Sequence, residues 1–188
     1  MLDTAAACLE QCPVPDPPPE LLGEPRAYGL VISSLVLTQL FSLPLLDVRD
    51  TITGVAPGMA ELQALHAPYN TAADAFRRRV ALAHLDVLAA LVAPSGVGVL
   101  ITDVSGYVVS GSHDVPDAAS RDVVPVLPRD QFDLRTELAA RFTLQGNPNT
   151  LRPWQWLTSL PTGTQPGRGY TVTGAVLRSL AGPSLRPK

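Results

Sequence analysis

The chain has 188 residues, of which 46% are hydrophobic and 16% charged, and its formal net charge is −3. This composition can supply a folded core and excludes disorder throughout, because disordered chains combine low hydrophobicity with high net charge. The acidic balance excludes the positive footprint of a general nucleic-acid binder. Cys8 and Cys12 are the only cysteines, too few for a four-cysteine zinc site, so no metal site is expected.

The chain is expected to open with a short helix and a proline-rich arm. Residues 1–11 suit a helix, and six prolines between residues 12 and 25 then favour an extended loop, since proline has no N–H and blocks a helix interior. We therefore divide the chain into an arm, residues 1–26, and an α/β domain, residues 27–188. No basic region followed by an apolar stretch opens the sequence, which favours a cytoplasmic location over secretion.

Residues 27–46 carry no charge and have about the length that crosses a bilayer. Serine, threonine, glycine and proline interrupt this stretch, however, and favour a division into shorter elements over a membrane span. Residues 28–33 are typical of a buried strand, and residues 35–41 place their large apolar side chains on one helical face. A strand followed by a helix is predicted, and no membrane partner is expected.

A long helix over residues 71–93 is predicted next. Thr71 and Asp74 have the spacing of a capping box, apolar residues then recur every three or four positions, and Pro94-Ser95-Gly96 is expected to end the helix. The apolar run at 97–103 follows. A helix that leads into a fully apolar strand is half of a βαβ unit, so strands 28–33 and 97–103 are expected to be parallel neighbours.

The last third predicts a helix within 130–142 and a β-hairpin with strands near 152–159 and 169–178, the second lying antiparallel beside 97–103. The expected fold is α/β: a partial, doubly wound, mostly parallel sheet of Rossmann type that ends in an antiparallel hairpin.

Three stretches in this order resemble the C-terminal half of class I S-adenosylmethionine-dependent methyltransferases. Residues 27–40, YGLVISSLVLTQL after Ala27, are similar to the fourth strand of that family and the turn after it, and residues 84–103 are similar to the following helix, turn and fifth strand. The hairpin is similar to the one that ends the family's fold. Gly29 stands where the family commonly has Asp, and Ser95 replaces the first glycine of the turn.

The resemblance implies S-adenosylmethionine as the cofactor, although the family's Gly-rich loop after the first strand has no counterpart in this sequence. The chain is therefore expected to begin after that strand and its helix. Ligands of open α/β sheets bind at the carboxyl ends of parallel strands. The expected cofactor-binding residues are Ser33, Ser34, Leu35 and, as the ribose-binding acid of a second strand, Asp3. The expected substrate-binding residues are Asp103, Trp154 and Trp156.

Each of these residues also has a plainer interpretation. Ser34 can cap the following helix, Asp103 can cap a turn, Asp3 can be an exposed acid, and the tryptophans can cover the hairpin. No catalytic base is assigned, because positioning of the acceptor dominates catalysis in the family. Ser33, Asp103 and His113 occur in the chain order of α/β-hydrolases, but no Gly-x-Ser-x-Gly elbow accompanies them.

The predicted function is methyl transfer to a small-molecule or protein acceptor, by a truncated or degenerate methyltransferase that needs the missing N-terminal half. The alternative is a non-catalytic interaction module that kept the sheet and lost the cofactor loop. In both cases strand 28–33 becomes an apolar, uncharged sheet edge, so self-association through it is expected.

Overall fold

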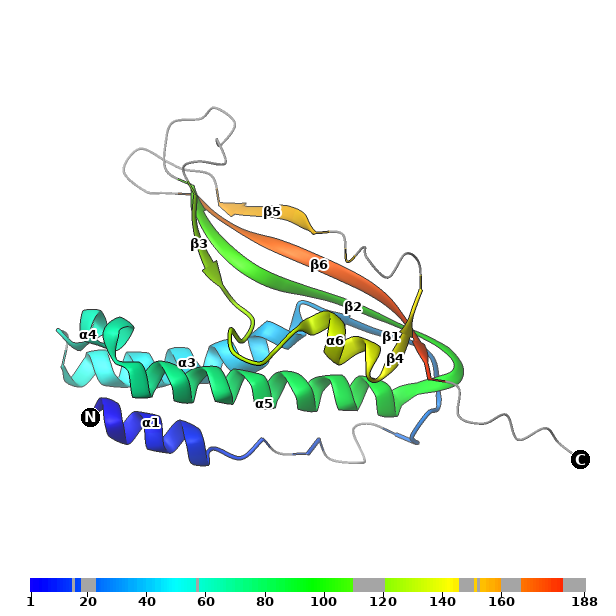
Figure 1. Cartoon of the computed structure of the whole chain (residues 1–188), viewed down its shortest axis with the longest axis horizontal. Helices are drawn as coiled ribbons and strands as arrows, with labels where there is room; N and C mark the ends of the chain where they lie inside the picture. The colour runs from blue at the N-terminus through cyan, green and yellow to red at the C-terminus, as the bar shows by residue number, and fades with distance from the viewer. Residues whose placement is uncertain are drawn as a thin grey trace, which may run out of the picture.

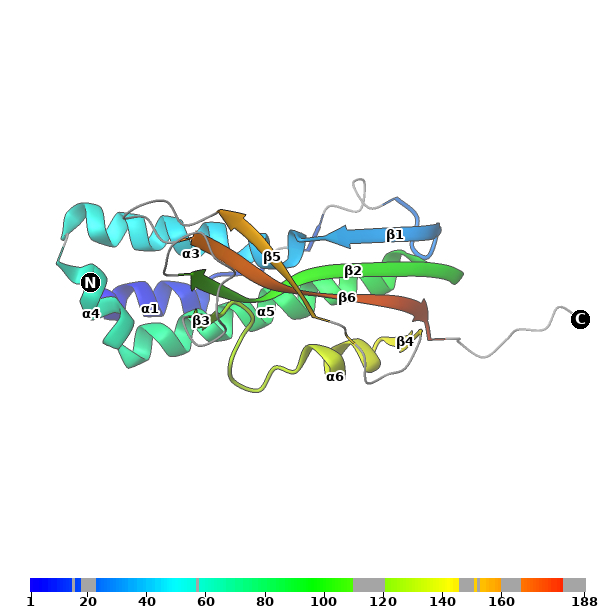
Figure 2. The ribbon, with the colours of Figure 1, turned by 90° about the horizontal axis from the view of Figure 1, so that it is seen from above.

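The computed structural model describes the following residues: 1–14, 16–17, 23–56, 58–109, 121–145, 151, 153–159 and 167–180. The helices are α1 (Leu2–Gln11), α3 (Val36–Val55), α4 (Met59–Leu65), α5 (Ala67–Leu91) and α6 (Leu134–Ala139). The strands are β1 (Tyr28–Ser34), β2 (Val92–Val109), β3 (Arg121–Pro125), β4 (Phe142–Leu144), β5 (Trp154–Ser159) and β6 (Gly167–Ser179). Together they form an α/β fold with one six-stranded mixed sheet, and the helices lie on one side of it (Figures 1 and 2).

The sheet has the order β1-β2-β6-β4, with β3 paired to β2 and β5 paired to β6. Strand β1 is parallel to β2, β6 is antiparallel beside β2, and β5 is antiparallel to β6. The predicted neighbours 28–33 and 97–103 and the predicted terminal hairpin are therefore confirmed. The expectation of a mostly parallel sheet is wrong: β1 and β2 are the one parallel pair among the described strands, because β3, β4, β5 and β6 all pair antiparallel.

The uncharged stretch 27–46 divides into β1 and the first half of α3, as predicted. Helix α3 continues through Pro44 to Val55. Leu45 and Ile52, beyond the proline, are buried, and this burial favours continuing the helix past the hydrogen bond that Pro44 cannot make. Among the described helices, none is both long and apolar enough to cross a membrane.

Helix α5 begins four residues earlier than the capping-box pattern predicts. His66 is its N-cap, and the Nδ1 atom of His66 accepts a hydrogen bond of 3.2 Å from the Tyr69 N–H. The helix ends at Leu91, so the expected stop at residues 94–96 lies inside β2. Gly96 is needed there because a side chain would start 2.7 Å from the Tyr28 carbonyl oxygen, where β1 approaches β2.

The core lies between α5 and the face of the sheet that this helix covers, which we call the covered face. Leu85 and Leu88 of α5 are buried, as are Leu100 of β2 and Leu177 of β6, and all four belong to one apolar cluster. Helix α1 packs against α5 and adds its own apolar side chains to that cluster. The helix of the N-terminal arm is thus part of the core of the domain.

Three consecutive arginines on α5 have different partners, and two of them contact other segments of the chain. Arg77 forms an ion pair of 3.8 Å with Asp74. The Nε atom of Arg78 donates to the Gln131 carbonyl oxygen at 3.1 Å. Arg79 donates to the carbonyl oxygens of Leu9 and Cys12 at 2.7 and 3.2 Å, and so satisfies acceptors at the C-terminal end of α1 that the helix itself leaves free. Arg78 and Arg79 thus hold neighbouring segments on α5, whereas the ion pair of Arg77 lies within the helix.

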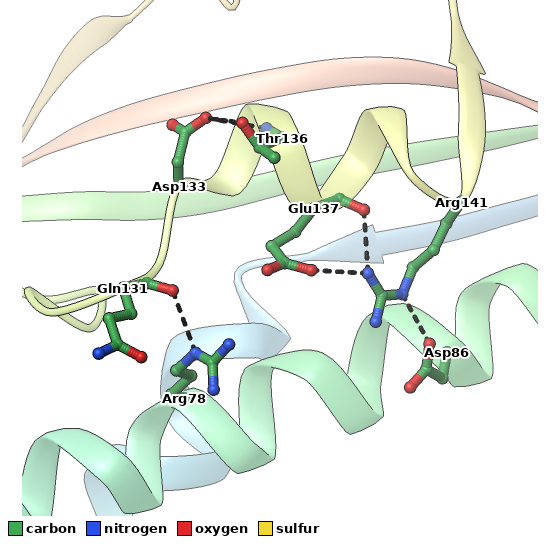
Figure 3. Close-up of polar contacts among 7 residues, drawn as sticks. All are labelled: Arg78, Asp86, Gln131, Asp133, Thr136, Glu137 and Arg141. Carbon is green, nitrogen blue, oxygen red and sulfur yellow. Dashed lines mark hydrogen bonds and ion pairs between the residues drawn. The ribbon is translucent and has the colours of Figure 1, made fainter.

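Helix α6 is fixed by a second set of polar contacts (Figure 3). Asp133 caps it by accepting the Thr136 N–H at 2.9 Å, and the hydrogen bonds from Thr136 hold the pKa of Asp133 below its ordinary value. Arg141, just after α6, contacts Asp86 of α5 at 2.6 Å and Glu137 at 2.8 Å. These carboxylates raise the pKa of Arg141.

Asp74 is a buried polar link between α5 and the segment before α6. Its two carboxylate oxygens accept the N–H groups of Arg129 and Asp130, each at 3.0 Å. We expect Asp74→Ala to lower the free energy of unfolding by about 2 kcal/mol, because two backbone N–H groups lose a partly buried carboxylate acceptor. Chemical denaturation measures this loss. The matched control is Asp50→Ala, whose side chain is 67% exposed; an equal loss in both variants would contradict the assignment.

Candidate functional site

The two faces of the sheet differ sharply in exposure. Ser33 pairs in register with Leu100, and both are buried on the face that α5 covers. Their neighbours Leu30 and Ile32 point to the opposite face and are 59% and 61% exposed, because successive side chains of a strand alternate between faces. No described helix covers this second face, which we call the open face (Figures 1 and 2).

A cleft of about 360 Å³ lies on the open face at the carboxyl end of β1, where its parallel pairing with the longer strand β2 stops at Ser34 and Ile101. It is lined by Ser34, Leu35, Ile101, Trp154, Gln155, Trp156 and Val172. Four of these are residues that the sequence singled out: Ser34 and Leu35 from the strand end, and Trp154 and Trp156 from the hairpin. The fold brings these two groups together although about 120 positions separate them in the sequence, because β5 pairs with β6, which in turn lies beside β2 in the same sheet.

The junction between β1 and α3 forms one wall of the cleft. Leu35 is the N-cap of α3 and has a left-handed backbone with φ of 58°, a conformation that costs a non-glycine residue about 1 kcal/mol. The Leu35 N–H holds this turn by donating to the Ile101 carbonyl oxygen at 2.8 Å. Capping of α3 by Ser34 is therefore wrong: Ser34 precedes the cap, is exposed, and lines the cleft.

The tryptophans form the opposite wall. Trp154 and Trp156 are 45% and 47% exposed and share one face of β5 because they are two residues apart. A side chain at Gly174 would start 3.4 Å from the six-membered ring of Trp154, so this indole lies directly over the glycine of β6. The six-membered ring of Trp154 therefore contacts the sheet at Gly174, while 45% of the residue remains exposed.

Ser33 does not reach the cleft. Its side chain is buried on the covered face of the sheet, and its Oγ atom lies 2.8 Å from Nε2 of His84 on α5. Burial lowers the pKa of His84 and so favours its neutral ring; the tautomer of that ring decides which of the two groups donates the hydrogen bond. The Ser33 hydroxyl is thus buried and already paired, and His113, the third residue of the hydrolase order, lies outside the described residues.

Asp103 lies two residues beyond Ile101 on β2, next to the cleft but not in its lining. Its Oδ2 atom accepts a hydrogen bond of 3.2 Å from the Thr38 hydroxyl of α3, whereas its Oδ1 atom is buried and has no partner among the described residues. Burial raises the pKa of Asp103, against the smaller lowering effect of Thr38. No turn follows Asp103, because β2 continues to Val109, so the turn-capping interpretation is wrong.

Asp3 lies in a helix and not, as expected, at the end of a ribose-binding strand. Residues 2–11 form α1, not the end of a strand, and α1 packs on α5 beneath the covered face. The carboxylate of Asp3 lies 3.3 Å from Nε2 of His66, the N-cap of α5. The assignment of Asp3 to a ribose-binding strand end is therefore corrected: its contact links the first turns of α1 and α5.

The described residues do not form a complete binding site for S-adenosylmethionine. Ser33 and Asp3 are engaged by histidines on the helix side, and the sequence has no Gly-rich loop to approach the cofactor. No group of three or more potential metal ligands occurs among the described residues. Ser34, Leu35 and the two tryptophans can hold a ligand of another kind, uncharged and partly apolar.

A larger hollow of about 490 Å³ lies beside the N-terminal part of α5. Its charged lining residues are Asp74, Arg77, Arg129 and Asp130. The formal charges of these two acids and two bases cancel. Asp74 is already occupied by backbone N–H groups, as described above. We therefore regard the cleft on the open face, with its unoccupied polar groups, as the candidate site.

Sequence reasoning missed several residues that build this site. Ile101, Gln155 and Val172 line the cleft without any motif, and Gly174 supports Trp154 from an adjacent strand. Gly174 alone carried a signal, because a glycine inside an apolar strand indicates close approach of another group.

Comparison of the chain with models of protein families, with curated proteins and with solved structures found no match in any of the three.

The raised pKa of Asp103 predicts a pH effect on stability. A carboxyl group that binds its proton more tightly in the folded state favours folding below its ordinary pKa, and this contribution is lost as the pH rises through the folded pKa. We expect Asp103→Asn to be more stable than the wild type at neutral pH and to lack this loss. Denaturation at a series of pH values checks this, with Asp47→Asn, an exposed position on α3, as the control. Lower stability of Asp103→Asn at neutral pH would contradict it.

Proposed function

We propose that this chain is the acceptor-binding part of a class I S-adenosylmethionine-dependent methyltransferase. The observation that carries the proposal is the strand arrangement: parallel β1 and β2, followed by β6 antiparallel beside β2 with β5 on its outer side. The resemblance of residues 27–180 to the C-terminal half of this family predicts these pairings, and a partial Rossmann-like sheet accounts for them.

The position of the cleft supports the same proposal. Open α/β sheets bind ligands at the carboxyl ends of their parallel strands, and Ser34 ends β1 where its parallel pairing with β2 stops at Ile101. In a methyltransferase the acceptor must be held against the reactive methyl group while water is excluded. Two half-exposed indoles beside this edge supply apolar surface for such a task.

The proposal requires the cofactor to be held by a segment outside these 188 residues. Ser33 and Asp3 have other partners, and Ser34 and Leu35 alone supply neither a ribose-binding acid nor a run of glycine N–H groups. When bound, S-adenosylmethionine would supply the methyl group. The residues of this chain would orient the acceptor and shield it from solvent.

The second candidate is a non-catalytic interaction module, and one observation favours it. Strand β1 is an edge of the sheet and exposes Tyr28, Leu30 and Ile32 at 42%, 59% and 61%. Sheet edges with unpaired backbone groups and apolar side chains pair readily with another chain.

The proposed function is tested by titrating S-adenosylmethionine, in a calorimeter, into the 188-residue chain and into a chain extended upstream in the same reading frame. We expect no binding in the micromolar range for the 188-residue chain and measurable binding for the extended chain. An extended frame that lacks a Gly-rich loop, or that does not bind, would contradict the proposal. Micromolar binding by the 188-residue chain would show that the cofactor site lies within it.

The exposed edge predicts self-association of the 188-residue chain. We expect Ile32→Lys to shift it toward the monomer in sedimentation velocity, because a charge on an edge strand opposes pairing with a second copy. Leu62→Lys on α4 is the matched control, since that side chain is 53% exposed but lies outside the sheet. A wild-type chain that sediments as a monomer at all concentrations would overturn the prediction.

A further inference from the structure

The cleft on the open face has no charged side chain in its lining. The lining residues with polar side-chain atoms are Ser34, Gln155 and the two tryptophans, and none of these side chains forms a hydrogen bond within the described part of the chain; Gln155 lies between the tryptophans and therefore points to the other face of β5. The nearest acid along β2, Asp103, is turned to Thr38. A charged ligand would lose its hydration here without gaining a counter-ion, so the lining favours an uncharged one.

The shape of the cleft favours a flat ligand. The Trp154 ring rests on Gly174, so its position is fixed by the sheet while 45% of the residue stays exposed. An indole supported in this way presents a rigid apolar face, on which planar rings stack in an offset arrangement. Aromatic side chains on sheets bind bases in this manner, with little sequence preference because every base has a π-face.

The size of the cleft limits the ligand to a small group. A volume of about 360 Å³ is near the lower end of ligand pockets, which span roughly 300–1,000 Å³. It suits one ring system with its edge hydrogen-bonded and leaves little space for an attached chain.

We propose that the cleft binds an uncharged planar heteroaromatic ring of the nucleobase type, stacked on Trp154 and hydrogen-bonded at its edge by Ser34. This deepens the proposed function, on which it rests for the role of the ring as the acceptor. Ring binding itself requires only residues of this chain.

The chain contains two tryptophans, and both line the cleft, so its tryptophan fluorescence reports on this site alone. We expect adenosine to change this fluorescence saturably, with excitation at the red edge of the indole band, and ribose at the same concentrations to have no effect. Trp154→Leu should weaken adenosine binding about tenfold, the magnitude of one lost stacking contact. Trp154→Phe keeps a ring and should stay within a few-fold of the wild type.

Both variants retain Trp156 as the only probe, so their signals are directly comparable, and circular dichroism establishes that each is folded. Val176→Leu, on the open face but outside the cleft lining, should leave adenosine binding unchanged. AMP should bind no more tightly than adenosine and without salt dependence.

The proposal is overturned if adenosine causes no saturable change, if Trp154→Leu binds as the wild type does, or if AMP binds more tightly in a salt-dependent way. Adenosine binding without S-adenosylmethionine binding by the extended chain would refute the proposed function alone. The reverse result would refute the ring-binding cleft alone.

Discussion

The packing of helix α5 against one face of the sheet is the contact on which the other elements depend. A sheet alternates its side chains between two faces, and the face that carries Leu100 and Leu177 must be buried for the sheet to form in water. Helix α5 supplies that cover, and it also carries the polar groups that attach its neighbours: His66 and Arg79 for α1, Asp74 and Arg78 for the segment before α6. Loss of α5 would therefore expose the core and release both segments.

This one-sided packing explains where the candidate site lies. Because every described helix is on the side of α5 (Figure 1), the side chains of the open face meet solvent, and the site forms where that face is interrupted at the end of β1. The left-handed turn at Leu35 directs the chain from β1 into α3 and leaves Ser34 and Ile101 uncovered. The hairpin then places two tryptophans beside them, so the same lack of cover that exposes apolar surface also creates a binding cleft.

The sequence predicted the site residues that lie at the end of an apolar strand. It did not predict which candidate residues would instead be engaged by side chains distant in the sequence. Ser34 and Leu35 follow an apolar parallel strand, and such strand ends gather ligands in any open α/β sheet. Ser33 has the same sequence context but points to the opposite face, where His84 binds it. Asp103 faces Thr38, and Asp3 faces His66; both partners are more than 60 positions away in the sequence, so local patterns could not reveal them.

The sequence by itself determined the short-range features: the division of residues 27–46 into a strand and a helix, the long helix before the second apolar strand, and the terminal hairpin. These follow from apolar periodicity and turn residues, which act over a few positions. Only the tertiary structure decided that Arg78 and Arg79 bind neighbouring segments, that His66 caps α5, and that antiparallel pairs outnumber the parallel one. Those features depend on hydrogen bonds and packing between residues distant in the chain, and neither the periodicity nor the charge of a segment specifies which distant group it will meet.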